Sequence, residues 1–171
     1  MSHWKIYLLS YIWGTLFVTQ IILVFIFGIV NCNRLTILAY IGVVIWWFAV
    51  ILAWLPIFML KRKGNVPKGK SFVHTTEMVE SGLYAIIRHP QYTAGILFSF
   101  SLFLISQTWL ISWMSFIVIL LMYKDILLAD KHEVEKFGDA YKLYMKKVPR
   151  SNFLLGIVRL MQRRQKKRIV D

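Results

Sequence analysis

Two short polar stretches hold the residue types that could do chemistry, and the first is a corner built around a proline. Arg88 and His89 directly precede Pro90. Proline disfavours helical geometry at the residue before it and suits the first turn of a helix that follows. We therefore expect His89 in front of a helix N-terminus, where free N–H groups and a partial positive charge suit a carboxylate or a phosphate. The plainer alternative is a histidine that only belongs to a turn.

The second polar stretch indicates a helix rich in acidic and basic residues. Glu133 and Phe137 follow Asp130 by three and seven residues, so the three side chains share one helix face. Gly138 then ends the helix. Two carboxylates on one face suit a cationic ligand or a proton transfer. The alternative is a solvated face whose acids pair weakly with neighbouring lysines.

Other chemical motifs are weak. Residues 64–71 fit the letters of a phosphate-binding loop, G-x-x-x-x-G-K-[ST], but an apolar run precedes them where that loop needs a strand. We interpret them as a basic loop beside a membrane. The four histidines show no HxxxH or HExxH spacing, and a single cysteine leaves no multi-cysteine site. We therefore expect no metal.

The elements that position these stretches are membrane helices. Of the 171 residues, 58% are hydrophobic and 17% charged, against about half and about a quarter in soluble domains. This argues against a water-soluble fold and excludes a disordered chain. Uncharged runs cover residues 6–30, 35–60 and 92–123. A span needs about 20 apolar residues, so each of the first two runs predicts one transmembrane helix.

Charge decides how the third run crosses. The net charge is +13, and most Lys and Arg residues lie between the second and third runs or after residue 123. Positive loops stay in the cytoplasm, so both ends of the third run are expected there. The run then crosses an even number of times. We predict a tight helical hairpin with spans at about 92–105 and 109–123, turning near residues 106–108.

The predicted fold is an all-α integral membrane protein with about four transmembrane helices and a cytoplasmic C-terminal helical segment. Residues 1–171 would form a single membrane domain with both termini cytoplasmic. Its polar cytoplasmic parts are residues 70–92, where a short helical turn ends at Gly82, and residues 124–152. The basic tail, residues 153–171, predicts binding to anionic membrane lipids at about 1 kcal/mol per basic residue. No motif favours nucleic acid.

The polar motifs have a recognisable order. Glu-Ser-Gly-Leu-Tyr at 80–84 leads into Arg-His-Pro-Gln-Tyr at 88–92. After the hairpin come Phe-Gly-Asp-Ala-Tyr at 137–141 and Val-Pro-Arg at 148–150. Over roughly residues 70–152 this set resembles the isoprenylcysteine carboxyl methyltransferase family and its relatives, the phospholipid N-methyltransferases. The resemblance implies a membrane enzyme that transfers a methyl group from S-adenosylmethionine, bound on the cytoplasmic side, to a lipid-like or small apolar acceptor.

Carried over by position, the resemblance also implies site residues. Two places where the family often has adjacent glutamates hold Ala129 and Asp130 here. Asp125 falls near an arginine that the isoprenylcysteine enzymes use for substrate handling, and Lys124 beside it is a substitute. The isoprenylcysteine ester reaction loses support from these departures, while the cofactor site does not. The residues implied for the cofactor are Thr76, Glu77, Met78, Val79, Tyr84, His89, Pro90, Gln91, Tyr92 and Asp130.

Several alternatives stay open at this level. Sterol reductases resemble the same C-terminal region, so an NADPH-dependent membrane reductase is one, although those chains are generally much longer. A non-enzymatic basic membrane scaffold is another. The acceptor can be an amine, a carboxylate, a thiol or a phenol. A general base is optional, with His89 or Asp130 as candidates. The expected location is the cell membrane of a prokaryote or the endoplasmic reticulum of a eukaryote.

Overall fold

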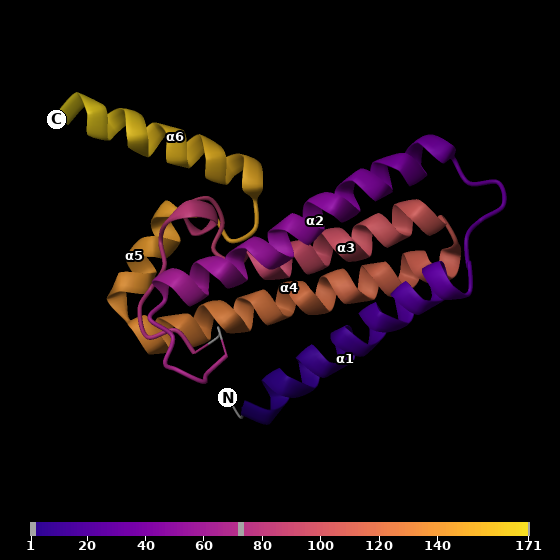
Figure 1. Cartoon of the computed structure of the whole chain (residues 1–171), viewed down its shortest axis with the longest axis horizontal. Coiled ribbons are helices and arrows are strands. Elements are labelled where there is room, and N and C mark those ends of the chain that lie inside the picture. The colour runs from indigo at the N-terminus through magenta and orange to yellow at the C-terminus, as the bar shows by residue number, and fades with distance from the viewer. Residues whose placement is uncertain (1–2, 72–73, 171) are drawn as a thin grey trace. The chain divides into compact units, whose positions relative to one another are not determined.

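The computed structural model describes residues 3–71 and 74–170, and all regular structure within them is helical (Figure 1). This confirms the all-α prediction. The elements in chain order are α1 (His3–Ile21), the π-helix η1 (Ile22–Ile26), α2 (Thr36–Lys63), the 3-10 helix η2 (Gly82–Ala85), α3 (Pro90–Ser106), α4 (Trp109–Phe137), α5 (Asp139–Lys147) and α6 (Phe153–Val170).

Three of the described helices are long and apolar enough to cross a membrane. They are Leu8–Ile26, which runs through α1 into η1, together with α2 and α4. The fourth apolar helix, α3, has 17 residues and is shorter than the about 20 that a straight span needs. The chain is therefore an all-α membrane protein, with three candidate spans and one shorter apolar helix where the sequence predicted about four spans.

The chain divides into two compact units. The first unit comprises residues 1–52 and 92–129, and the second comprises residues 53–91 and 130–171. Helices α2 and α4 contribute residues to both. The first unit holds most of the apolar helices, and the second holds most of the polar motifs.

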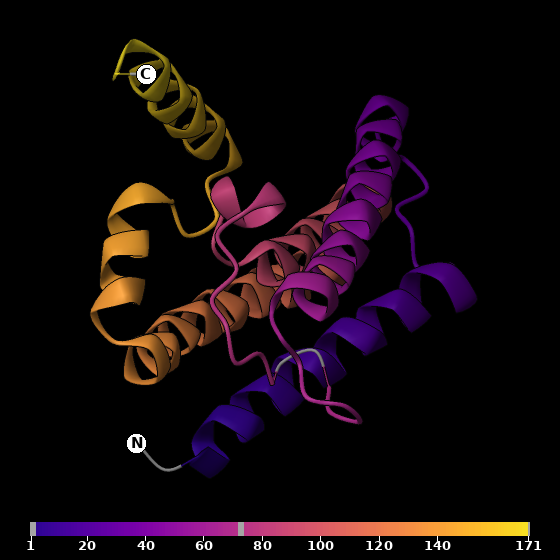
Figure 2. The same cartoon turned by 60° about the vertical axis from the view of Figure 1, so that its left-hand side comes forward.

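A buried amide ties three helices of the first unit together. Gln20 of α1 donates from Nε2 to Ser115 Oγ of α4 at 2.8 Å, and its Oε1 accepts from Ser99 Oγ of α3 at 2.9 Å. Ser115 Oγ in turn donates to the Ser99 carbonyl at 2.9 Å. The three helices lie side by side in both views (Figure 1, Figure 2). Side-chain hydrogen bonds of this kind hold helices together where apolar burial gives no drive for association.

A glycine lets α2 and α3 approach closely in the first unit. A Cβ built on Gly42 would lie 2.9 Å from the Ser101 carbonyl oxygen and 2.9 Å from Ile105 Cγ1. Because the first of these atoms is backbone, any larger residue would push the helices apart. Small residues have this role at many membrane helix interfaces.

The hairpin turns where the sequence predicted, since α3 ends at Ser106 and α4 begins at Trp109. Gln107 adopts a left-handed backbone, with φ of 51°. Its side-chain amide donates to the Leu35 carbonyl at 2.9 Å and accepts from the Leu35 N–H at 2.8 Å. These bonds compensate for the strain of a positive φ. They also fasten the loop before α2 to the hairpin tip, as expected if both lie on one side of a membrane.

The prediction of a short helical turn that ends at Gly82 is wrong. Residues 74–81 contain no helix, and Gly82 instead begins η2 with φ of 62°. A Cβ at Gly82 would lie 2.1 Å from Met59 Cε, so the glycine permits a close approach to α2 within the second unit. This contact across 23 positions is invisible to a local pattern, which is why the glycine was assigned to the wrong end of a helix.

Candidate active site

A buried aspartate in the second unit collects four hydrogen-bond donors. Asp130, on α4, is 4% exposed. Its Oδ1 lies 2.8 Å from His89 Nε2 and 3.0 Å from the Tyr141 hydroxyl. Its Oδ2 accepts from Arg88 Nη2 at 3.1 Å and from Arg150 Nε at 2.7 Å. An ionised carboxylate only accepts, so each of these four groups donates. We call these five residues the Asp130 cluster.

Backbone pairing brings the two basic motifs of the cluster together. The N–H of Arg88 donates to the Pro149 carbonyl at 3.1 Å, and the N–H of His89 donates to the Arg150 carbonyl at 3.2 Å. Pro90 follows at once and begins α3, as its missing N–H and fixed φ favour. The corner expected at His89 is therefore present, and the Val-Pro-Arg motif is the partner that holds it.

Tyr141 of the cluster and two further tyrosines, Tyr84 and Tyr144, are buried in the second unit. The hydroxyl of Tyr144 donates to the Tyr84 carbonyl, and the rings of Tyr141 and Tyr144 are 5.6 Å apart between centroids. Burial raises the pKa of Tyr141, and the Asp130 carboxylate raises it further. Burial also raises the pKa values of Tyr84 and Tyr144. All three hydroxyls therefore stay protonated near neutral pH and act as donors rather than as bases.

The cluster has more donors than acceptors. One carboxylate, that of Asp130, faces the guanidinium groups of Arg88 and Arg150. Arg88 Nε is buried and has no hydrogen-bond partner among the described residues. A buried donor left without a partner costs about 1–3 kcal/mol. The arrangement would therefore gain from an anionic ligand.

A second carboxylate lies close by and is uncommitted. Glu133, half-buried, stands one turn after Asp130 on α4. Its charge adds to burial in raising the pKa values of Tyr84 and Tyr141. Among the described residues, no hydrogen bond or ion pair engages the Glu133 carboxylate. This part of the second unit thus offers an unpartnered cationic donor and an unpartnered anion.

The residues predicted upstream lie in two different settings. Val79 is buried, and Met78 packs against the core of Tyr141, Tyr144 and Val148. Thr76 and Glu77 are exposed and hold a loop, because Thr76 Oγ1 donates to the Asn65 carbonyl at 2.8 Å and Glu77 accepts from Asn65 Nδ2 at 3.3 Å.

The other predicted residues divide between the units. Tyr84, His89, Pro90 and Asp130 meet in the second unit, as described above. Gln91, half-buried, also belongs to the second unit, while Tyr92, Lys124 and Asp125 belong to the first.

Sequence reasoning missed Tyr141 and Arg150 as site residues and noticed them only outside any predicted site. The charge of Arg88 was considered as a partner for the cofactor carboxylate, but not as a partner of Asp130. A faint signal existed, because an arginine stands in each of the two motifs that flank the hairpin. Nothing local, however, indicates that both side chains turn toward one aspartate.

The first unit contains a second buried aspartate, Asp125, which is 1% exposed. Its Oδ2 accepts from Ser10 Oγ at 2.7 Å and from Trp13 Nε1 at 2.9 Å, both on α1. Its Oδ1 is buried and has no hydrogen-bond partner among the described residues. Acidic groups within apolar helices are costly and mark functional sites by default. Lys124, next to it in sequence, is exposed.

The fold and the two aspartate sites define a helical membrane protein that holds polar chemistry on its last apolar helix. The family model described as phospholipid methyltransferase matches residues 37–140. That match covers more than half of the chain, and the chain belongs to this family. It is therefore a membrane protein of a methyltransferase family, as the motif order predicted. Searches of curated proteins and of solved structures find no match.

Proposed function

We propose that the protein transfers a methyl group from S-adenosylmethionine to the amino group of a phospholipid. The family supports methyl transfer and a lipid acceptor. The cofactor assignment rests on two groups in the second unit that have no protein partner among the described residues: Arg88 Nε, which is buried, and the carboxylate of Glu133, which is half-buried.

These groups fit the cofactor's chemistry. S-adenosylmethionine has a carboxylate at the same end as its ammonium and sulfonium charges. Arg88 would hold the carboxylate by a charge-assisted hydrogen bond. Glu133 would face the cationic groups, and the tyrosine rings near it suit a cation through their π faces. When bound, the cofactor supplies an electrophilic methyl group that a nucleophile attacks in line, so positioning and exclusion of water carry most of the catalysis.

Within this proposal, Asp130 is a positioning residue. Its two oxygens accept four hydrogen bonds and so fix Arg88 and His89 in place. The wider set of predicted cofactor residues remains part of the proposal: Thr76, Glu77, Met78, Val79, Tyr84, His89, Pro90, Gln91, Tyr92 and Asp130.

For the acceptor, we propose that Asp125 handles an amine. A lipid amine is protonated in water, and its nitrogen must be neutral to attack. Asp125 Oδ1, unpartnered and buried, would accept the proton of the ammonium group, leaving a carboxylic acid and a free amine lone pair. That lone pair would then form a bond to the methyl carbon while the bond from this carbon to the cofactor sulfur breaks, and the electrons of the broken bond would stay on sulfur. Lys124 would pair with the lipid phosphate.

The proposed topology follows from charge alone. Both termini are cytoplasmic, because the basic loops favour that side. The basic tail binds anionic lipids of the cell membrane or the endoplasmic reticulum.

Methyl transfer from S-adenosylmethionine with a labelled methyl group tests the proposal. The purified protein is placed in lipid nanodiscs that contain phosphatidylethanolamine or, as a control, only phosphatidylcholine. A farnesylcysteine peptide is offered in a third arm, and NADPH oxidation with a sterol in a fourth. We expect labelled lipid in the first arm only. Labelling of the peptide alone would reject the amine, and NADPH oxidation without methyl transfer would favour a reductase.

A further inference from the structure

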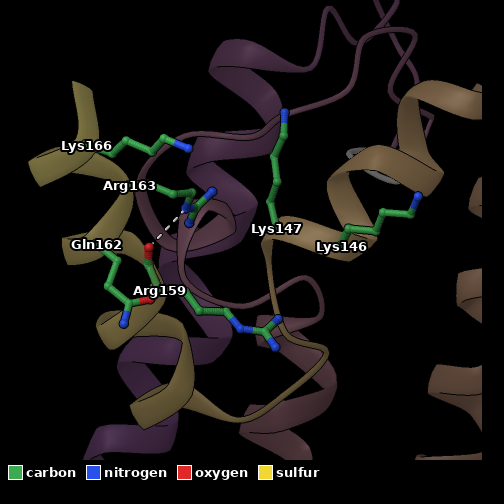
Figure 3. A pocket seen from close by; sticks show the side chains of 6 residues that line it. All are labelled: Lys146, Lys147, Arg159, Gln162, Arg163 and Lys166. Atoms are coloured by element: carbon green, nitrogen blue, oxygen red, sulfur yellow. Dashed lines mark hydrogen bonds between the residues drawn. The ribbon is translucent and has the colours of Figure 1, made fainter. Parts of the chain in front are cut away.

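A strongly basic cavity lies in the second unit, between α5 and α6. Its volume is about 440 Å³. Two lining residues come from α5 and four from α6 (Figure 3). The lining consists of five cationic side chains and one amide, with no acid: Lys146, Lys147, Arg159, Gln162, Arg163 and Lys166.

The five cations lack a paired acid among the described residues, because none of them forms a salt bridge with an Asp or Glu there. Like charges around one space repel each other, and a bound anion would relieve that repulsion. Phosphate suits such a site because its oxygens accept from Lys ammonium groups and from the planar fork of Arg.

The exposed face of α6 indicates that the phosphate belongs to a lipid. Leu154, Val158 and Met161 are spaced by four and three residues, so they form one row along the helix. They are 78%, 50% and 58% exposed. A helix with an apolar row and a basic side suits the membrane interface, where the row enters the acyl boundary and the cations meet headgroups.

The cavity is also connected to the Asp130 cluster within the second unit. Arg163, which lines the cavity, donates from Nη2 to the Ala85 carbonyl at 2.7 Å. Gly156 of α6 is buried, and a Cβ there would lie 2.1 Å from the Ile86 carbonyl oxygen. Ala85 and Ile86 immediately precede the segment that presents Arg88 and His89. An anion that fixes α6 would therefore also steady that segment.

We propose that this cavity binds the phosphate of an anionic phospholipid and that the bound lipid orders the segment leading to Arg88 and His89. Its residues differ from those proposed for the methyl acceptor, and lipid binding there does not depend on the proposed methyl transfer. It also differs from a diffuse attraction of the whole basic tail, because specific residues of α5 and α6 form it.

Lipid titration of the full chain tests the binding site. Purified protein in detergent is titrated with phosphatidylglycerol or phosphatidylcholine, and native mass spectrometry counts the bound lipids. The cavity variant carries Lys147→Gln and Lys166→Gln. The matched control carries Arg164→Gln and Arg168→Gln, two exposed residues of the same tail that do not line the cavity. Each variant removes two positive charges.

We expect the cavity variant to bind the first phosphatidylglycerol molecule with an affinity lower by about tenfold or more, because it loses two charge-assisted contacts. The control should keep nearly the wild-type affinity. Equal weakening in both variants would overturn the cavity site in favour of diffuse attraction. A parallel titration with inorganic phosphate distinguishes a lipid headgroup from free phosphate as the ligand. The lipid assignment would be overturned if wild-type protein binds free phosphate in the absence of lipid, if the cavity variant does not, and if the phosphate displaces bound lipid.

Amide hydrogen exchange tests the coupling without any cofactor or methyl transfer. Phosphatidylglycerol should slow exchange at residues 83–89 in the wild type and in the control variant, but not in the cavity variant. Thermal unfolding of all three proteins checks that they are folded. Unchanged exchange at residues 83–89 in wild-type protein with lipid bound would overturn the coupling.

Discussion

Two buried aspartates on α4, five residues apart in the sequence, have opposite surroundings. Asp130 has four donors on its two oxygens, and two of them are guanidinium groups. Asp125 has two neutral donors on one oxygen and none among the described residues on the other. A carboxylate whose oxygens are both satisfied is held rigidly, while an unsatisfied buried oxygen calls for a functional explanation. The comparison supports the proposal that Asp130 is a positioning residue and that Asp125 handles the substrate.

The donors of both aspartates extend beyond residues 37–140, the stretch that the family model matches. Arg88 and His89 lie inside this stretch, whereas Tyr141 and Arg150, the other two donors to Asp130, follow it. Ser10 and Trp13, the donors to Asp125, lie outside it on α1. The first helix therefore contributes to a polar site that the matched stretch alone does not complete.

The largest effect is expected at Asp130. Replacing it with alanine leaves two guanidinium groups without their carboxylate, and loss of one partner from a buried ion pair costs about 3–5 kcal/mol. Thermal unfolding in detergent should show a large fall in melting temperature. Asp139→Ala is the control, because that exposed carboxylate pairs with Lys142 at the surface. A melting temperature for the Asp130 variant as high as that of the control would remove the positioning role.

Asp125→Asn should leave the fold intact and remove the reaction. An asparagine oxygen still accepts from Ser10 and Trp13 but does not take a proton from an amine. Loss of a general base typically costs about 10²–10⁴-fold in rate, measured here as initial rates of methyl transfer to phosphatidylethanolamine. Trp13→Phe, which keeps the carboxylate, should retain most of the rate. A fully active Asp125→Asn protein would contradict the assignment.

Glu133→Gln should lower the affinity for the cofactor by about tenfold, because one charge-assisted contact is lost. Equilibrium binding of labelled S-adenosylmethionine measures the effect. Glu135→Gln is matched in charge and lies on the same helix, but it is exposed, and its affinity should equal that of the wild type. If both variants bind equally well, Glu133 does not face the cofactor.

The smallest effect is expected for Tyr141→Phe, which removes one hydrogen bond to Asp130, worth about 1 kcal/mol. Tyr40→Phe, at an exposed position, should change nothing. Burial raises the pKa of Tyr141 above its ordinary value of 10.0. The protonated form is therefore favoured in the folded state, and the stability that it contributes is complete below about pH 10 and decreases above it. Urea unfolding at pH 7 and at pH 9 should show the same difference in the free energy of unfolding between the Tyr141→Phe variant and the wild type.

The sequence predicted the features that local patterns determine. The uncharged runs predicted the apolar helices, and the charge asymmetry predicted the hairpin that turns at Gln107. Pro90 predicted the corner at His89 and the start of α3. The basic tail predicted only an electrostatic role, whereas the structure makes it the helix α6, with one apolar row.

Long-range pairing is what the sequence could not show. Arg88 and Asp130 are 42 residues apart, and Ser10 and Asp125 are 115 apart. Which donors meet which carboxylate depends on helix packing, and no periodic pattern encodes it. The same limit explains why Asp130 was expected to face the cofactor, whereas the structure fills its oxygens with protein donors and leaves Glu133 uncommitted. Its predicted contact with the cofactor stays a prediction.

Equilibrium binding of labelled S-adenosylmethionine to folded wild-type and Asp125→Asn protein, with S-adenosylhomocysteine as competitor, separates the proposed cofactor site from the proposed acceptor site. We expect saturable, competed binding of equal affinity in both proteins, because Asp125 is proposed to serve the acceptor and residues of the second unit to hold the cofactor. No saturable binding to folded wild-type protein at millimolar cofactor would contradict the methyltransferase proposal. Binding to the wild type that Asp125→Asn abolishes would contradict the division of roles between the two aspartates.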